Sequence, residues 1–269
     1  MSTQKSASVC YIMKNAAFAA GDRLISRGEV QETHLELLDK LMTGWFSDGG
    51  GDVLLWTDGL TKPMLAQRAR DGYELADFTG DTAGYRGPCF AACGTGGSAV
   101  IGSDLFEACL GIAFLDEMRI WASVVYDPMH VELFHAVNGL GAYLNGKRIS
   151  PAPSRKLCGA DVFLGQAALR TGGKPIQSLI CEAGHVRSGA PCALELCRAA
   201  CGRVDAAVLR NEAFIDCAAG LLIVQEAGAA LQDRFGEPFG GLREYGQRID
   251  ITVVCPGLAD ELARCMSEN

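Results

Sequence analysis

A glycine-rich turn, CGTGGS at residues 93–98, is the stretch of this sequence best suited to bind an anion. Glycine lets consecutive backbone N–H groups point toward one anion, and a helix that starts there would add its positive end. We therefore expect Gly94, Thr95 and Gly96 to bind phosphate, with Thr95 as a candidate catalytic residue. Taken alone, the turn also fits a tight bend without a ligand.

The first residue of this turn, Cys93, is a second candidate catalytic residue. A thiol beside several backbone N–H groups can have a lowered pKa and act as a nucleophile. Against this, the sequence places none of its four histidines at the turn as a general base, and a Cys-x5-Arg loop would need arginine where Ala99 stands. We favour Cys93 as a neutral space filler and keep a Cys93-dependent transferase or hydrolase as an alternative.

The composition limits the partners and the redox chemistry. The net charge of -8 opposes binding to nucleic acid or to anionic membranes. The sequence has no run of about 18 uncharged apolar residues and no signal peptide, so we expect a cytoplasmic protein. Its twelve cysteines are scattered through apolar segments, which indicates reduced core residues rather than disulfides or zinc ligands.

Helical periodicity predicts the elements of the first half that precede this turn. Apolar residues recur at helical spacing over 15–27 and 34–46, which predicts two N-terminal helices. After the turn cluster SDGGGD, a third helix is expected over residues 57–71, with Asp58 near its start and Pro63 in its first turn.

After the glycine-rich turn, shorter apolar runs separated by turn residues predict an antiparallel sheet. The second half of the chain is predicted to alternate strands and helices. Residues 107–116, 120–128 and 131–149 read as antiparallel strands. Beyond Pro151 we expect a strand at 160–165, helices at 193–201 and 216–226, and a strand at 250–255. The chain therefore divides into an α+β half, 1–150, and an α/β half, 151–269.

Three segments carry a resemblance to a known family. They are SGAPCALELCRAACGRVDAAVLRNEAFIDCAAGLLIVQEAGAALQD at 188–233, VVYDPMHVELFHAVNGLGAYLNGKRI at 124–149 and DVLLWTDGLTKPML at 52–65. In their order along the chain, these segments resemble the inositol monophosphatase family. The resemblance implies an α/β fold with αβαβα layers, a homodimer, and magnesium-dependent hydrolysis of phosphorylated small molecules.

The family's chemistry uses two Mg²⁺ ions, which activate water and stabilise the phosphate, and magnesium requires hard oxygen ligands. The family supplies them from Gly-Glu-Glu, Asp-Pro-x-Asp-Gly-Thr and Trp-Asp. In this chain Asp216 stands at the Trp-Asp aspartate, after Ile215. FAACGT at 90–95 replaces the second motif and removes both aspartates. GDTAG at 80–84 matches the first motif, with Asp81 and Thr82 replacing the glutamates.

These replacements leave Asp81 and Asp216 as candidate metal ligands, and we expect magnesium to bind weakly or not at all. Asp216 is also a candidate catalytic residue. The favoured interpretation is a repurposed enzyme or a non-catalytic protein that binds a phosphorylated polyol or sugar. The alternative is a divergent magnesium-dependent phosphomonoesterase that uses Asp81 and Asp216. A glutamate that binds substrate hydroxyls in the family is replaced by Leu209, which argues against inositol itself.

Three charged residues before or within the helix at 193–201 invite a functional interpretation. Arg187 matches an arginine of the family, and a role at the surface or in a dimer contact is expected at least as much as a role in ligand binding. Glu195 and Arg198 are three residues apart, and we interpret them as an exposed polar stripe of the helix.

Overall fold

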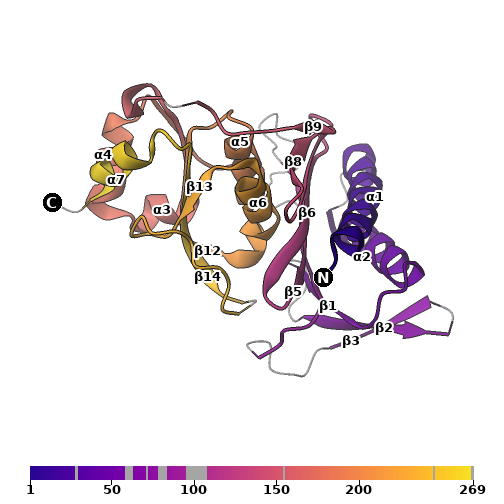
Figure 1. The fold of residues 1–269 in the computed structure, drawn as a ribbon. Coiled ribbons are helices and arrows are strands. Elements are labelled where there is room, and N and C mark those ends of the chain that lie inside the picture. Colours follow the sequence, from indigo (N-terminus) through magenta and orange to yellow (C-terminus); the bar gives the residue numbers. More distant parts are fainter. Residues whose placement is uncertain are drawn as a thin grey trace.

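The computed structural model describes residues 1–27, 30–57, 63–70, 72–77, 84–94, 108–153, 155–244 and 246–267. These residues form five layers in which two β-sheets alternate with three layers of helices (Figure 1). The predicted αβαβα order is therefore confirmed. None of the described helices is both long and apolar enough to cross a lipid bilayer.

The first layer consists of two N-terminal helices, α1 (Thr3–Arg27) and α2 (Val30–Ser47). Both were predicted, but α1 starts at Thr3 and not at the expected residue 15. They pack on each other and on one face of the first sheet (Figure 1). The core between them and the sheet contains large apolar side chains, among them Met13, Leu41, Trp45 and Phe114. Burial of this apolar face, rather than helix propensity alone, fixes the two helices on the sheet.

The first sheet has nine strands in the order β3-β2-β1-β4-β5-β6-β7-β8-β9. The strands from β4 onward pair antiparallel with one another, as the turn signals predicted for β5 to β9, whereas β4 pairs parallel with β1. The bounds are β1 (Val53–Thr57), β2 (Met64–Ala69), β3 (Gly72–Asp77), β4 (Cys89–Gly94), β5 (Leu110–Asp116), β6 (Arg119–Asp127), β7 (Glu132–Val137), β8 (Gly141–Leu144) and β9 (Lys147–Arg148).

The prediction of a third helix over residues 57–71 is wrong. Residues 64–69 form strand β2, whose antiparallel partners are β1 and β3. The segment MLAQRA is rich in good helix formers, but β1 offers a row of free backbone groups on one side and β3 does so on the other. Pairing on both sides outweighs an intrinsic preference worth a few tenths of a kcal/mol per residue. Asp58 lies outside the described residues.

The second sheet has five strands in the order β11-β10-β12-β14-β13. Strands β10, β11 and β12 run parallel, and β14 runs antiparallel to β12 and β13. Short helices α3, α4 and α7 cover its outer face (Figure 1). The bounds are η1 (Leu157–Gly159), β10 (Asp161–Leu164), α3 (Gln166–Thr171), α4 (Gly173–Glu182), β11 (His185–Arg187), β12 (Ala206–Ala213), β13 (Ala230–Gln232), β14 (Arg248–Val254) and α7 (Ala259–Met266).

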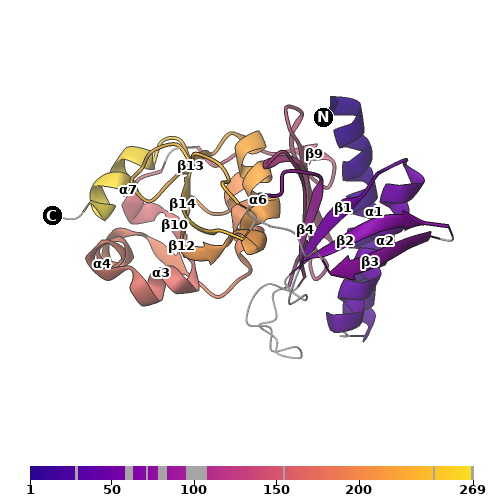
Figure 2. The same ribbon diagram turned by 90° about the horizontal axis from the view of Figure 1, so that it is seen from below.

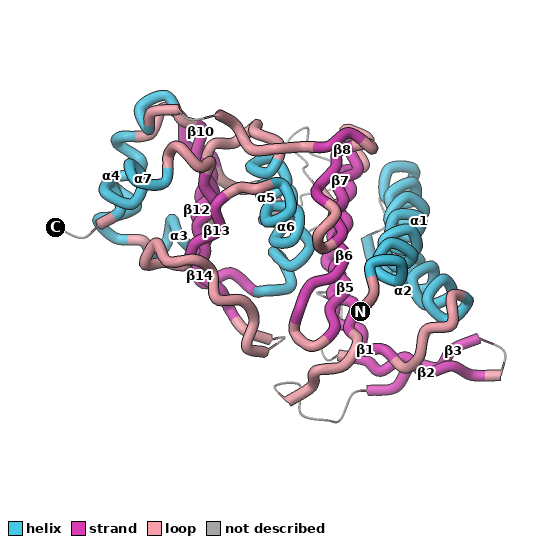
Figure 3. The backbone as a smooth tube through the Cα atoms, in the orientation of Figure 1, coloured by secondary structure: helices cyan, strands magenta, loops and turns pink. Residues whose placement is uncertain are grey.

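The middle layer consists of helices α5 (Cys192–Ala200) and α6 (Phe214–Ala227). They lie between the two sheets, as seen from below in Figure 2 and in the separation of cyan and magenta segments in Figure 3. Helix α6 is buried on nearly all sides, because it contacts strands of both sheets. The two predicted halves of the chain therefore share one central hydrophobic core.

Candidate functional site

Helix α6 holds the Asp-x-Ala-Ala-Gly motif, and the glycine that ends this motif, Gly220, lets α6 pack against α5. A Cβ atom at Gly220 would lie 2.6 Å from Cβ of Leu196 and 3.0 Å from the carbonyl oxygen of Ala193, both on α5. Glycine at this position therefore allows α5 and α6 to pack closely. Asp216 lies half-buried in the first turn of α6, where the helix dipole favours a negative charge.

The Gly-Arg-x-Asp motif at 202–205 connects α5 to β12 and joins the two halves of the chain. Gly202 has φ +77°, and a Cβ atom there would lie 2.8 Å from the backbone nitrogen of Ala152. Arg203 donates two hydrogen bonds of 2.6 Å to the carboxylate of Glu132 on β7. Asp205 is 3% exposed and accepts a hydrogen bond of 2.9 Å from the backbone of Asp161. These contacts give the motif a structural role.

The C-terminal end of α6 contacts the turn between β7 and β8. The carboxylate of Glu226 accepts hydrogen bonds of 2.8 Å from the backbone nitrogens of Gly139 and Gly141. Both glycines have positive φ, at +81° and +88°. The Gly-x-Gly turn and the Glu-Ala-Gly end of α6 are therefore parts of one contact, which fixes α6 on the first sheet.

The opposite ends of α5 and α6, their N-termini, lie next to each other. The thiols of Cys192 and Cys217 are hydrogen-bonded to each other, and this bond and burial raise the pKa of the Cys217 thiol well above its ordinary value. The negative charges of Asp216 and Glu212 act in the same direction on Cys217. Two carboxylates therefore lie near this pair of helix ends.

Glu212 is the site residue that sequence reasoning missed. Its Oε1 atom is buried and has no hydrogen-bond partner among the described residues. Burial raises the pKa of its carboxyl, although a hydrogen bond from the backbone of Ala167 to this carboxyl acts in the opposite direction. A Cβ atom at Gly165, the residue before α3, would lie 2.7 Å from this oxygen. Asn211 has φ +51°, and the register of β12 against β14 shifts between Leu209 and Glu212. The sequence signal for this irregularity was the pair Asn211-Glu212 within an apolar strand, because asparagine adopts positive φ more readily than most residues.

These features place Glu212, Gly165 and Asp216 at the carboxyl ends of the parallel strands β10 and β12, where ligands bind in open α/β sheets. The pair of half-buried carboxylates lies beside two helix N-termini. An unpartnered carboxylate oxygen can accept a hydrogen bond from a hydroxyl group of a ligand. We call Glu212, Asp216, Gly165 and the first residues of α5 and α6 the candidate site.

Strand β4, which leads to the glycine-rich turn, carries no carboxylate. Cys93 is 2% exposed, and its Sγ lies 2.8 Å from the position that a Cβ atom would take at Gly111. Ala219 of α6 and Ala193 of α5 lie within 3.7 Å of the same position. The Cys93 side chain therefore fills the space left by Gly111, next to both helices of the middle layer.

Phe90 lies on the other face of the same strand. It is fully buried against Trp45 and Phe114, with ring centroids 5.6 and 4.9 Å away. Successive side chains of a strand point to opposite faces, so Phe90 faces α1 and α2 while Cys93 faces α5 and α6. The aromatic residue at the first aspartate position of the family motif thus belongs to the hydrophobic core between α1, α2 and the sheet.

Several predicted site residues lie outside the described residues, namely Asp81, Thr82, Thr95 and Gly96. Their roles stay predictions. Gly94 is the last residue of β4, and Leu209 is fully buried in β12. Within the described ranges, no three His, Cys, Asp or Glu side chains lie close enough together to hold a metal ion.

The twelve cysteines are all free, and most of them are buried or half-buried, as predicted. The interpretation of Glu195 and Arg198 as an exposed stripe is wrong. Glu195 is 1% exposed and forms ion pairs with Arg198 and, at 3.1 Å, with Arg187 on β11. The stripe faces the protein because α5 lies between two sheets, and the buried carboxylate is compensated by two guanidinium groups.

Comparison with known proteins identifies relatives of the chain. The model of the inositol monophosphatase family matches residues 104–263. The Nus factor SuhB of Xylella fastidiosa is 27% identical over 230 residues, which are 82% of this chain and 80% of that protein. Inositol monophosphatase 1 of Solanum lycopersicum is 39% identical over 123 residues, 43% of this chain and 45% of the tomato protein.

Solved structures show the same fold. The crystal structure of the extragenic suppressor protein suhB from Bartonella henselae superposes with a TM-score of 0.73 at 20% identity. The match covers 97% of this chain and 99% of that chain. The arrangement of layers described above is therefore shared with that structure.

Proposed function

Because the chain belongs to the inositol monophosphatase family, we propose that it binds a phosphorylated polyol or sugar at the candidate site and is not an ordinary two-magnesium phosphatase. Relatives of the family act on phosphorylated small molecules, which supports the ligand class. The observation that carries the proposal is strand β4, where Phe90 packs into the hydrophobic core and Cys93 fills an apolar gap.

Magnesium fits the described residues poorly. Two Mg²⁺ ions need several hard oxygen ligands in near-octahedral order, and they would supply activation of water and neutralisation of phosphate charge. Strand β4 contributes no carboxylate or other side-chain oxygen, and a thiol is a poor ligand for magnesium. We therefore assign no step to a metal ion and base the function on the protein's own groups.

In this proposal the ligand is held at two points. The N-termini of α5 and α6 favour the phosphate through backbone N–H groups and helix dipoles, and the sequence predicts that Gly94, Thr95 and Gly96 bind it as well. Glu212, with its unpartnered Oε1, accepts a hydrogen bond from a hydroxyl of the polyol. Glu212 thus takes the place of the family's hydroxyl-binding glutamate, whose position is held by the buried Leu209.

Calorimetry and an assay of phosphate release from inositol 1-phosphate and hexose monophosphates, with and without Mg²⁺, test this proposal. We expect saturable binding without magnesium-dependent turnover above that of an Asp216→Asn variant. Glu212→Ala should weaken polyol phosphate binding about tenfold and leave inorganic phosphate binding unchanged, because one hydroxyl contact is lost. The control is Glu74→Ala, which removes an exposed glutamate of β3.

Strong magnesium-dependent turnover that disappears in Asp216→Asn would instead support the divergent phosphomonoesterase that uses Asp81 and Asp216. Absence of binding by any of these phosphates would contradict the proposal itself.

The Cys93-dependent transferase or hydrolase is less well supported, because the Cys93 residue is 2% exposed. Alkylation by iodoacetamide near neutral pH distinguishes it, with the exposed Cys158 and Cys181 as internal controls. We expect Cys93 to react more slowly than both. Faster reaction of Cys93 would favour the cysteine-dependent enzyme.

A further inference from the structure

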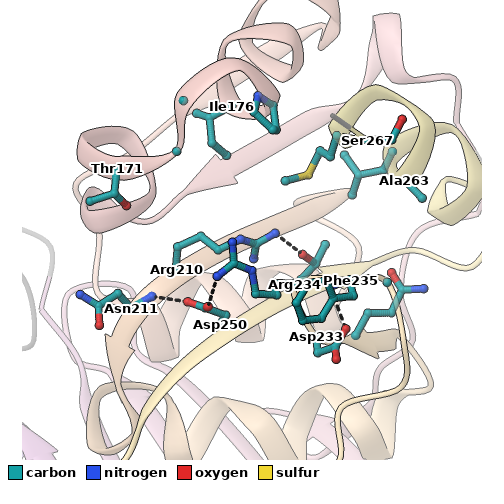
Figure 4. A pocket seen from close by; sticks show the side chains of 18 of the residues that line it. Thr171, Ile176, Arg210, Asn211, Asp233, Arg234, Phe235, Asp250, Ala263 and Ser267 are labelled. Carbon is teal, nitrogen blue, oxygen red and sulfur yellow. Dashed lines mark hydrogen bonds and ion pairs between the residues drawn. The ribbon is translucent and has the colours of Figure 1, made fainter. Parts of the chain in front are cut away.

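A cavity lies on the outer face of the second sheet, between strands β12 and β14 and helices α4 and α7 (Figure 4). Its volume is about 1250 Å³. Arg210, Asp250 and Thr252 reach it from alternate positions of β12 and β14, on the face opposite to α5 and α6. The sheet therefore separates this cavity from the core around α6.

Arg210 forms part of the base of the cavity and is half-buried there. Its guanidinium donates to the carbonyl oxygens of Ile251 at 2.8 Å and Leu209 at 2.9 Å, and to Oγ1 of Thr252 at 3.1 Å. No carboxylate of the described residues lies within ion-pair distance of it. Burial lowers the pKa of Arg210, which reflects the cost of holding this charge without a direct counter-ion.

A second guanidinium, that of Arg234, lies beside Arg210 over the same part of the sheet (Figure 4). The two carboxylate oxygens of Asp250 have different partners. Oδ1 accepts a hydrogen bond of 2.6 Å from the backbone nitrogen of Asn211, and Oδ2 lies 3.6 Å from the Arg234 guanidinium. Asp250 thus forms an ion pair with Arg234 and not with Arg210. Two neighbouring positive charges with so little compensation attract an anion.

The charged side chains of the lining give the cavity a net positive charge in an acidic protein. The lining carries four basic side chains and two carboxylates, whereas the chain has a net charge of -8. Asp233 accepts hydrogen bonds from the backbones of Phe235 and Glu237 and so fixes its own turn. The basic residues are Lys174, Arg210, Arg234 and Arg248.

The remaining wall of the cavity is apolar. Ile176 of α4 and Leu262 and Met266 of α7 line it. Phe235 is 80% exposed at the edge, with the Arg234 guanidinium 5.4 Å from the centre of its ring. An exposed aromatic ring beside a cationic base offers a surface for a planar or apolar part of a ligand.

From this geometry we infer that the cavity is a second binding site, for an organic phosphate whose anionic end lies between Arg210 and Arg234. Guanidinium groups bind phosphate through paired hydrogen bonds, and the free donors of two neighbouring arginines match its oxygens. The organic part of the ligand packs against the apolar wall of α4 and α7. This site is distinct from the candidate site, because Arg210 and Thr252 lie on the face of the sheet opposite to α6, whereas Asp216 belongs to α6.

Calorimetric titration of the full chain with phenylphosphonate, a stable phosphonate with an aromatic ring, tests this inference. Wild-type protein should bind it at least tenfold more tightly than inorganic phosphate. Arg234→Gln should weaken binding at least tenfold while preserving the fold, because the Arg234 side chain is 60% exposed. Arg210→Gln should have an equal or larger effect.

Arg264→Gln is the matched control, since Arg264 is an exposed arginine of α7 whose Nε donates to the backbone of Asp260. It should bind phenylphosphonate as the wild type does. Hydrogen exchange locates the site: the ligand should protect residues 206–213 and 248–254 in the wild type and not in Arg234→Gln. Unchanged affinity in Arg234→Gln, or equal affinity for inorganic phosphate and phenylphosphonate, would overturn the inference.

Discussion

Replacing Glu226 with alanine should destabilise the protein by removing the contact between α6 and the first sheet. The carboxylate accepts two hydrogen bonds of 2.8 Å from Gly139 and Gly141. Hydrogen bonds to a charged group contribute about 1.5–3 kcal/mol each, and the low end applies because this contact is partly exposed. Glu226 also lies in the last turn of α6, where a negative charge costs about 0.3–1 kcal/mol. The free energy of unfolding should therefore fall by about 2–3 kcal/mol.

Thermal unfolding followed by circular dichroism measures this loss. For a chain of this size it corresponds to a decrease in Tm of about 5–10 °C. Glu226→Gln keeps one acceptor oxygen and should fall between the wild type and Glu226→Ala. Gln225→Ala, at the exposed neighbouring position, is the control. If Glu226→Ala melted within about 1 °C of Gln225→Ala, the two hydrogen bonds would not stabilise the fold and the reasoning would be wrong.

Three further substitutions test other contacts. The hydrogen bonds from Arg203 lower the pKa of Glu132, so the pair stabilises the folded state above the ordinary glutamate pKa of 4.5 and this contribution is lost as the pH falls through the lowered value. Glu132→Gln should therefore cost about 1 kcal/mol near pH 7 and nothing in acid, and a cost independent of pH in urea titrations would contradict this. Gly220→Ala should cost about 1–3 kcal/mol through overpacking despite the better helix propensity of alanine, whereas Gly51→Ala, with open space around it, should be tolerated. Phe90→Asp should cost more than about 4 kcal/mol and give no phosphatase activity, because it places a charge in the hydrophobic core; a stable and active variant would show that position 90 faces the ligand.

Much of the fold was predictable because local patterns and tertiary structure agree. Helical periodicity predicted α1 and α2, and the Asp-Pro and Asn-Gly turns predicted the antiparallel strands up to β9. The sequence motif around Asp216 was enough to indicate the family. The fold adds the physical roles of the motif glycines: Gly220 allows α5 to approach, and Gly139 and Gly141 donate to Glu226.

The predictions from sequence were wrong where tertiary contacts, rather than local sequence patterns, decide the structure of a segment or the burial of a side chain. Residues 64–69 have the composition of a helix, but strands on both sides make them a strand. Glu195 has the spacing of an exposed pair but is buried between two sheets. No periodicity could reveal that Phe90 and Cys93 face different layers, or that Arg210 and Arg234, on different strands or turns, share one cavity.

The candidate site was predictable only in part. Asp216 was assigned from its motif, whereas Glu212 was missed because its position depends on the irregular register of β12 after Leu209. A local backbone shift of this kind has only a weak sequence signal, the asparagine at 211.

Calorimetric titration of the full chain with Mg²⁺, in the presence and absence of inositol 1-phosphate, tests the central claim most directly. The loss of oxygen ligands from β4 predicts no tight, stoichiometric binding of two ions per chain under either condition. Tight binding of two Mg²⁺ ions per chain would contradict the account, because it would require a complete set of oxygen ligands supplied by other residues.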